Sequence, residues 1–206
     1  TDNSAEVSWN ANGSETAWVI EYGAPGFTPG TGTEIGALNV SDTVGLVTGL
    51  DGNTSYDFYV AADCGTTPGD WGTISFTTDC GAYGLPFSET FEDDSETRVC
   101  WYNINEVGTD NWTYQTGSSG GVVNTAFEGS LNARYVSANA TSTAKLASPR
   151  IDISSQDSVA IIFAYAQESW FGSQNITKVY KRGSDTLPWI EIASYNVNTP
   201  EWTLDT

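Results

Sequence analysis

The chain has 206 residues, 39% of them apolar, and its 26 acidic residues outnumber 7 basic ones for a formal charge of −19. The apolar content supports a packed core, while the negative charge disfavours nucleic-acid phosphates and anionic lipids as partners. No His is present, which excludes Ser-His-Asp and Cys-His catalysis and imidazole zinc sites built from this chain alone. We therefore expect a protein that is not an enzyme, binds no nucleic acid and does not insert into a membrane, since no apolar run reaches about 18 residues.

Short alternating segments organise the first part of the chain, residues 1–79. The sequence is rich in Gly, Ser, Thr and Asn and has no long helical run, a composition typical of all-β secreted proteins. Apolar and polar residues alternate between turn signals, which is the pattern of half-buried strands. The expected strands cover residues 5–9, 17–23, 34–38, 42–48, 56–60 and 73–78.

Residues 5–79 resemble a fibronectin type III domain. The residues that carry the resemblance are Trp9, Trp18, Ile20, Tyr22, Leu50, Tyr56, Val60 and Ala61. The resemblance implies a β-sandwich with a tyrosine corner, in which the Tyr56 hydroxyl bonds back to the backbone. It also implies a first strand before Val7 that has no counterpart here. We expect Trp9 and Trp18 to belong to the core.

The three cysteines are widely spaced. Cys64 and Cys80 end successive expected strands, so a hairpin would hold them about 20 Å apart. A disulfide needs Cα atoms within ~7 Å. We therefore predict a Cys80–Cys100 disulfide and an odd thiol at Cys64, which would be buried or paired outside this sequence; the alternative is that all three are reduced.

The second part, residues 80–206, also consists of strands and turns, beginning with an expected strand at 86–92. It resembles the MAM-type jelly-roll group, which includes the cleaved adhesin domains of Bacteroidetes surface proteins. The motifs that carry the resemblance are Phe87-x-Glu89-x-Phe91-Glu92, Cys100-Trp101, Asp110-Asn111-Trp112, Leu146-x-Ser148-Pro149-x-Ile151-Asp152-Ile153, Ile162-Phe163-x-Tyr165, Trp189-x-x-Ile192 and Glu201-Trp202. The resemblance implies a jelly-roll β-sandwich, with closing strands that are missing here, in a secreted or cell-surface protein.

An acidic run follows the expected first strand of this second part. Its members are Glu89, Glu92, Asp93, Asp94 and Glu96. Carboxylate oxygens are the ligands that Ca²⁺ prefers, and the jelly-roll resemblance implies a structural Ca²⁺ near the first strand. We predict Glu92, Asp94 and Asp110 as its ligands; the alternative is a solvated acidic loop.

Aromatic residues in polar loops are the candidates for ligand contacts. Trp170 and Phe171, in the loop ESWFGSQN, and Trp112 are flanked by Asn, Asp and Gln, which suits stacking on sugar rings and hydrogen bonding to them. The alternative is that these rings fill the jelly roll. Thr43, Ser158 and Thr186 lie in Asp-Ser/Thr-aliphatic triplets that resemble the O-glycosylation motif of Bacteroidetes exported proteins.

Together these features predict a non-catalytic pair of adhesion or binding modules from a large secreted or cell-surface bacterial protein. The expected partner is a glycan or a surface protein, and self-assembly is a further expectation. Two other functions stay open. One is an accessory segment of a secreted hydrolase, such as a protease or polysaccharidase; the other is a structural unit of a surface filament.

Overall fold

The computed structural model describes residues 1–11, 13–34, 43–120, 123–137, 141–169 and 172–206. These residues form an all-β protein of small antiparallel sheets, and their longest helix is the short 3-10 turn η1 (Arg98–Cys100). No helix in the described part of the chain is long and apolar enough to cross a membrane. The chain divides into two compact units, one of residues 1–83 with 149–151 and the other of residues 84–148 with 152–206. The all-β prediction is therefore confirmed.

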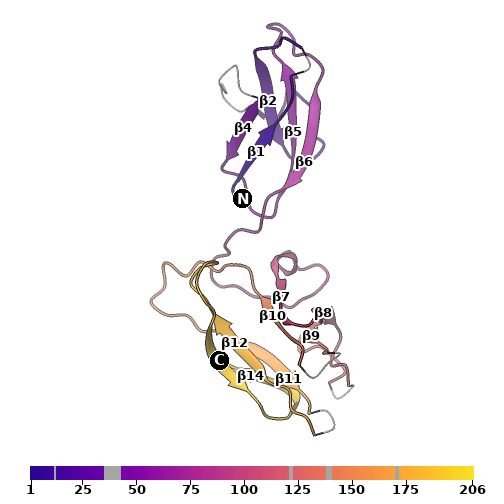
Figure 1. Cartoon of the computed structure of the whole chain (residues 1–206), viewed down its shortest axis with the longest axis vertical. Helices are drawn as coiled ribbons and strands as arrows, with labels where there is room; N and C mark the ends of the chain where they lie inside the picture. The colour runs from indigo at the N-terminus through magenta and orange to yellow at the C-terminus, as the bar shows by residue number, and fades with distance from the viewer. Residues whose placement is uncertain (12, 35–42, 121–122, 138–140, 170–171) are drawn as a thin grey trace. The chain divides into compact units, whose positions relative to one another are not determined.

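The first unit contains a two-stranded and a four-stranded antiparallel sheet (Figure 1). The two-stranded sheet pairs β1 (Ser4–Ser8) with β4 (Val44–Thr48). The four-stranded sheet has the order β3 (Thr33–Glu34), β2 (Trp18–Gly23), β5 (Ser55–Ala62), β6 (Gly72–Thr77). Residues 35–38 and 42 of the expected strands lie outside the described residues.

Side chains from both sheets form the core of the first unit. Its buried members are Val7, Ile20, Val47, Leu50 and Phe58. Phe58 is only 2% exposed. Trp9 and Trp18 pack against this cluster with their ring centroids 5.8 Å apart. Their rings meet edge to face, an arrangement that aromatic pairs prefer. The predicted placement of both tryptophans in the core is confirmed.

The hydroxyl of Tyr56 accepts a hydrogen bond from the backbone N–H of Asp51 at 3.0 Å. Tyr56 also stacks on Phe76, with ring centroids 5.9 Å apart. The turn before β5 is thus fixed to the strand that follows it, as the spacing of Leu50 and Tyr56 predicts.

Two buried carboxylates on the four-stranded sheet hold the Pro- and Gly-rich loop between β2 and β3. The Glu21 side chain accepts backbone N–H bonds from Gly30 at 2.8 Å and Gly32 at 3.2 Å. Asp57 accepts the Gly26 N–H at 2.7 Å and the Ser75 hydroxyl at 2.6 Å. Buried carboxylates are tolerated when such donors replace water.

Replacement of Asp57 by Asn should make the melting temperature less dependent on pH in acid. The Ser75 hydroxyl, and then the Gly26 N–H, lower the pKa of Asp57 below its usual value. A carboxyl with a lowered pKa in the folded state adds stability above its unfolded pKa of about 3.9, and this stability is lost as the pH falls through the folded pKa. Melting temperatures measured from pH 6 to pH 2 should therefore fall less steeply below pH 4 in Asp57→Asn than in the parent. The exposed Asp70→Asn variant changes the charge equally, and identical profiles for the two variants would contradict this role.

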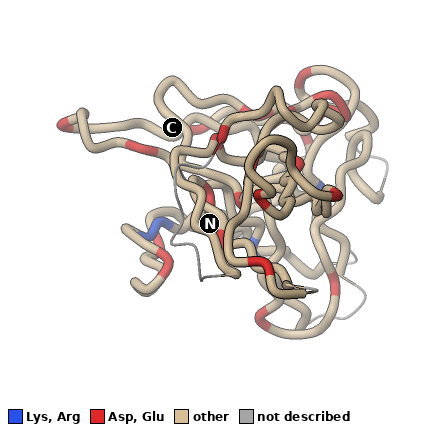
Figure 2. Tube along the Cα trace, turned by 90° about the horizontal axis from the view of Figure 1, so that it is seen from above, with Lys and Arg blue, Asp and Glu red and all other residues tan. Residues whose placement is uncertain are grey.

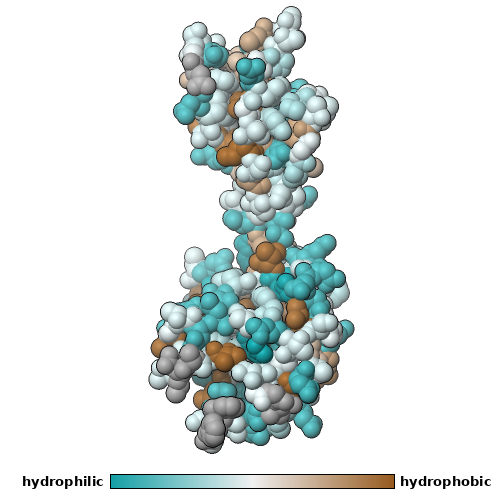
Figure 3. Space-filling view, turned by 90° about the vertical axis from the view of Figure 1, so that its right-hand side faces the viewer, coloured by the Kyte–Doolittle hydropathy of each residue, from teal (hydrophilic) through white to brown (hydrophobic). Residues whose placement is uncertain are grey.

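In its described residues, the second unit contains four antiparallel strand pairs. They are β7 (Tyr102–Val107) with β10 (Thr143–Ala147), β8 (Trp112–Gln115) with β9 (Asn132–Tyr135), β11 (Phe163–Gln167) with β14 (Thr199–Asp205), and β12 (Thr177–Lys181) with β13 (Ile190–Tyr195). Several large apolar side chains stay at the surface, where Figure 3 shows hydrophobic residues in brown. Ile162 is 68% exposed and Leu204 is 58% exposed.

The prediction of a strand at residues 86–92 is wrong. Phe91 has φ +66, a left-handed conformation that interrupts extended backbone. Its N–H donates to the Glu89 carboxylate at 2.6 Å rather than to a neighbouring strand. This local side-chain bond competes with sheet formation.

The predicted Cys80–Cys100 disulfide is confirmed, but Cys64 is not buried. Cys80 and Cys100 form a disulfide, and Cys64 is an exposed free thiol. Antiparallel pairing of β5 with β6, with Ser55 opposite Thr77, explains why Cys64 and Cys80 lie at opposite ends of this hairpin.

Candidate functional site

The side chain of Glu92, a predicted calcium ligand, accepts hydrogen bonds from a loop that is distant in the sequence. Its Oε1 atom accepts the backbone N–H groups of Ser130 at 2.7 Å and Leu131 at 2.8 Å. Gly129 has φ +69, and a Cβ atom there would lie 2.4 Å from Glu92 Oε1. The close approach of carboxylate and backbone therefore requires glycine at position 129.

Side chains of the acidic run form hydrogen bonds with residues within the run and next to it. Glu89 Oε2 accepts the Ser95 hydroxyl at 3.0 Å and the Thr97 hydroxyl at 2.7 Å. Arg98 donates to the Asp93 carboxylate at 2.8 Å and to the Phe91 carbonyl at 2.9 Å. Both Glu89 and Asp93 are thus partnered by this chain's own donors.

The three carboxylates predicted to bind calcium do not form a metal-binding cluster. Within the described ranges, no group of three or more His, Cys, Asp or Glu side chains is arranged to hold a metal ion. Asp94 is exposed on a turn, and the Asp110 carbonyl accepts the Asn105 side-chain amide at 3.1 Å. A Ca²⁺ ion here would need backbone, amide and water oxygens to reach six or more ligands.

Trp112 is the one predicted ligand contact that the structure describes. The residue is half-buried on β8, and its indole N–H donates to the Ala144 carbonyl at 3.0 Å. Its ring centroid lies 5.5 Å from that of Tyr135. These contacts fix the ring and use its only donor within the unit. Trp170 and Phe171 lie outside the described residues.

The predicted glycosylation residues occupy different environments. Thr43 is half-buried immediately before β4, where its carbonyl accepts the Trp9 N–H at 3.0 Å. Ser158 and Thr186 are exposed outside the strands, so their hydroxyls are open to modification.

An arginine-centred group of aromatic side chains lies on the second unit. The Arg182 guanidinium donates to the Tyr102 hydroxyl and to the Asp185 carboxylate. The same guanidinium lies over the Trp189 ring, 4.4 Å from its centroid, which is cation–π distance. Tyr102 is 43% exposed, so the arginine holds the hydroxyl of a residue that is accessible to solvent. We call Tyr102, Arg182, Asp185 and Trp189 the Arg182 surface.

A second basic and aromatic group lies on β10, β12 and β13. Lys145 Nζ lies 4.7 Å from the Tyr180 ring centroid and pairs with Glu106. Lys178 Nζ lies 2.8 Å from Glu191 Oε2, and this hydrogen bond raises the pKa of Lys178. Basic residues are few in the trace of Figure 2, where acidic positions are red and basic ones blue. Most of these few therefore have acidic or aromatic partners.

A cluster of three aromatic rings joins β11 to β13. The Tyr195 ring centroid lies 4.6 Å from that of Tyr165 and 5.9 Å from that of Phe163. The Tyr195 hydroxyl donates to the Asp205 carboxylate at 2.5 Å, and this bond, with burial and the carboxylate charge, raises the pKa of Tyr195 to about 12. The same bond lowers the pKa of Asp205. The cluster is a cross-strand packing feature of the second unit.

Sequence reasoning missed the Arg182 surface. A signal was present, because Lys178, Lys181 and Arg182 are close together in a chain poor in basic residues, with Tyr180 and Trp189 beside them. The contact with Tyr102 spans 80 positions, and no local pattern reports it.

No protein-family model matches this sequence, and no curated protein matches it significantly.

Proposed function

We propose that this chain is a non-catalytic pair of β-modules from a large secreted or cell-surface bacterial protein, and that its second unit binds a glycan of a cell surface through the Arg182 surface. The observation that carries the proposal is that Tyr102 is 43% exposed while Arg182 donates a hydrogen bond to its hydroxyl. Arg182 also covers Trp189. One cation therefore orders two aromatic side chains.

Such an arrangement suits a sugar ring. The apolar face of a sugar stacks on an exposed aromatic ring, and nearby polar groups bond to its hydroxyls. Asp185 offers carboxylate oxygens, since its side chain is 64% exposed. Because Arg182 already fixes Tyr102, binding loses less side-chain entropy than it would with a mobile ring.

The proposal includes a fibronectin type III-like sandwich in the first unit and a MAM-type jelly roll in the second. The bond from Asp51 N–H to the Tyr56 hydroxyl supports the first assignment, since it is the contact that a tyrosine corner requires. The four antiparallel strand pairs of the second unit are compatible with a jelly roll.

The glycan proposal is tested by array binding of the whole chain. Tyr102→Ala and Trp189→Ala should each weaken binding at least about fivefold, the loss that defines an energetically important contact residue. Val107→Ala is the matched control, since Val107 is 51% exposed on the same strand as Tyr102. Trp112→Ala tests the residue predicted from sequence. Equal binding by Tyr102→Ala, Trp189→Ala and the parent chain would remove the Arg182 surface from consideration.

A structural Ca²⁺ near the acidic run is a second part of the proposal, supported by the density of carboxylates from Glu89 to Glu96. A bound ion stabilises the folded state in proportion to the logarithm of its free concentration. Melting in 1 mM Ca²⁺ should therefore occur at a higher temperature than melting in excess chelator. Equal melting temperatures would mean that the run is only a hydrogen-bonded acidic loop. Asp94→Asn, which changes an exposed predicted ligand, should reduce the shift, whereas Asp70→Asn in the first unit should not.

The alternative functions have their own test. An accessory segment of a secreted hydrolase predicts a catalytic domain elsewhere in the same open reading frame, and a filament unit predicts concentration-dependent assembly of the purified chain. Sequencing of the complete reading frame distinguishes the hydrolase segment from an adhesion module. Light scattering of the purified chain distinguishes the filament unit from an adhesion module.

A further inference from the structure

Three aromatic side chains meet on the outer face of the four-stranded sheet in the first unit. Tyr59 follows the buried core residue Phe58 on β5, so its side chain projects to the opposite face of the sheet. The Tyr59 ring centroid lies 4.9 Å from that of Phe27 and 6.4 Å from that of Trp71. Both contacts are edge-to-face, with interplanar angles of 81° and 83°. We call Phe27, Tyr59 and Trp71 the Tyr59 surface; each of them is half-buried and keeps part of its surface exposed.

The loop between β2 and β3 holds the Phe27 ring in place. A Cβ atom at Gly32 would lie 2.8 Å from Phe27 Cζ, and one at Gly23 would lie 3.0 Å from Phe27 Cδ1. The ring therefore packs directly against two positions at which any larger residue would displace it. Glu21 and Asp57 bond the backbone of the same loop to the sheet. Phe27 is thus positioned before a ligand arrives, which reduces the entropy that binding costs.

Carboxylates lie on the same face of the sheet as these rings. Glu21 is directly opposite both Tyr59 on β5 and Glu34 on β3, and residues opposite each other in paired strands project to the same face. Asp57 lies two positions before Tyr59 on β5 and therefore also shares its face. Glu34 is exposed to solvent. This face of the sheet therefore attracts cations and repels anions.

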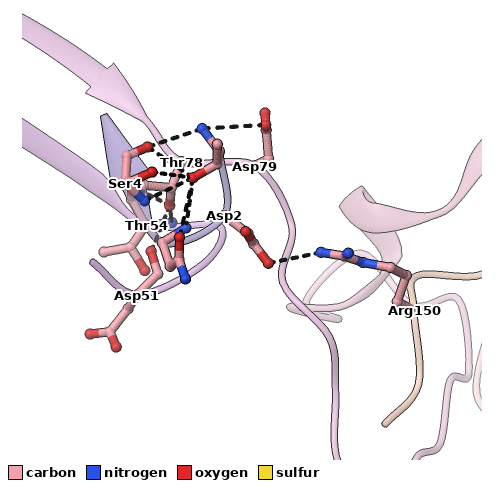
Figure 4. Close-up of polar contacts among 9 residues, drawn as sticks. Asp2, Ser4, Asp51, Thr54, Thr78, Asp79 and Arg150 are labelled. Carbon is pink, nitrogen blue, oxygen red and sulfur yellow. Dashed lines mark hydrogen bonds and ion pairs between the residues drawn. The ribbon is translucent and has the colours of Figure 1, made fainter. Parts of the chain in front are cut away.

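In the described part of the first unit, no Lys or Arg side chain lies over these rings. Residues 1–83 contain neither residue type. Arg150, which belongs to this unit, pairs with Asp2 at 2.8 Å (Figure 4). In the second unit, by contrast, three described rings are covered by basic side chains of the chain itself. These pairs are Arg98 with Tyr114, Lys145 with Tyr180 and Arg182 with Trp189, at 5.0, 4.7 and 4.4 Å from the ring centroid. The Tyr59 surface is therefore available to a cationic ligand.

We propose that the Tyr59 surface binds the quaternary ammonium group of a small, water-soluble molecule of the choline type. A cation is attracted to the face of an aromatic ring when it lies within about 6 Å of the ring centroid. In the corner between two nearly perpendicular rings, a compact cation lies against both of them. The carboxylates of this face add a long-range attraction. The site is in the first unit and the Arg182 surface is in the second, so the two proposals stand independently.

The hydrogen bonds of the carboxylates favour a quaternary ammonium over a primary one. A primary ammonium is strongly hydrated and carries three N–H donors that require acceptors. The side chains of Glu21 and Asp57 already accept backbone N–H groups of the loop. A quaternary ammonium has no N–H group and needs no such acceptor. A phosphate next to the ammonium would be repelled by the exposed Glu34 carboxylate, which disfavours phosphocholine as the ligand.

The test titrates the whole chain with choline at constant ionic strength and follows the backbone amides by NMR. Choline should shift the amide signals of Phe27, Tyr59 and Trp71. Its neutral isostere, in which carbon replaces the nitrogen, has the same shape and no charge, so it should bind at least about fivefold more weakly. Ethanolamine and phosphocholine should also bind more weakly than choline. Absence of shifts at tens of millimolar choline overturns the proposal, as does equal binding of choline and any of the three other compounds.

Variants of the Tyr59 surface separate cation binding from packing. Trp71→Leu and Phe27→Leu each keep an apolar side chain but remove an aromatic face, so each should weaken choline binding about fivefold and leave the binding of the neutral isostere unchanged. Glu34→Gln removes an exposed charge from this face and should weaken choline binding about twofold. The control Glu6→Gln removes an exposed charge from the two-stranded sheet and should have no such effect. Parent-like affinity for choline in either Leu variant would overturn the proposal, and equal effects of the two Gln variants would contradict the role of this face.

Discussion

Replacement of Phe58 by Ala is expected to lower the free energy of unfolding of the first unit by ~3–5 kcal/mol. Phe58 is the largest fully buried side chain among the described residues, with 2% of its surface exposed. It lies near the middle of β5, between Tyr22 on β2 and Ile74 on β6. Truncation removes the buried ring and leaves a cavity that strands paired on both sides cannot readily close.

Urea denaturation followed by tryptophan fluorescence measures this loss, because Trp9 and Trp18 pack against the same cluster. Leu46→Ala is the control, since Leu46 is also on a strand of this unit but is 58% exposed. Its effect should stay within about 0.5 kcal/mol. A similar loss for the two variants would mean that Phe58 is not the centre of a packed core.

Strand prediction succeeds where one face of a strand is buried. Val7 and Phe58 alternate with exposed or polar neighbours, and both lie in strands within the core cluster. Residues 86–92 show a similar alternation of Phe87, Glu89 and Phe91 but form no strand. The difference is that the Glu89 carboxylate captures the Phe91 N–H. Alternation reports burial on a face, whereas such a local side-chain bond leaves no periodic trace.

The candidate sites depend on contacts between distant positions, which a single sequence does not reveal. Glu92 is recognisable as part of an acidic run, but its bond to the Leu131 N–H spans 39 positions and gives it a structural role. Arg182 is recognisable as a basic residue near aromatic ones, but its bond to Tyr102 joins positions 80 residues apart. By contrast, strand length argues against a Cys64–Cys80 bridge, because an extended hairpin keeps its two ends apart, and the Cys80–Cys100 disulfide is the remaining pairing that closes a short loop.

Joint replacement of Cys80 and Cys100 by Ala should lower the free energy of unfolding by ~3 kcal/mol, the value expected for a disulfide that closes a short loop. The crosslink acts largely by restricting the unfolded chain. The double variant should therefore lose stability even though Ala can occupy the buried position of Cys100, which is 6% exposed. Ala is chosen because a Ser hydroxyl at position 100 would need a hydrogen-bond partner in a buried site.

Cys64→Ala provides the matched control, since Cys64 is an exposed free thiol and its removal should change stability by no more than about 0.5 kcal/mol. Thiol titration gives an independent measurement on the parent chain. Cys64 alone should react in the folded protein and in denaturant without reductant, and Cys80 and Cys100 should become reactive only after reduction. Reaction of Cys80 or Cys100 before reduction would show that the bridge is not formed, and the double variant would then be expected to lose only the packing of the buried Cys100 side chain.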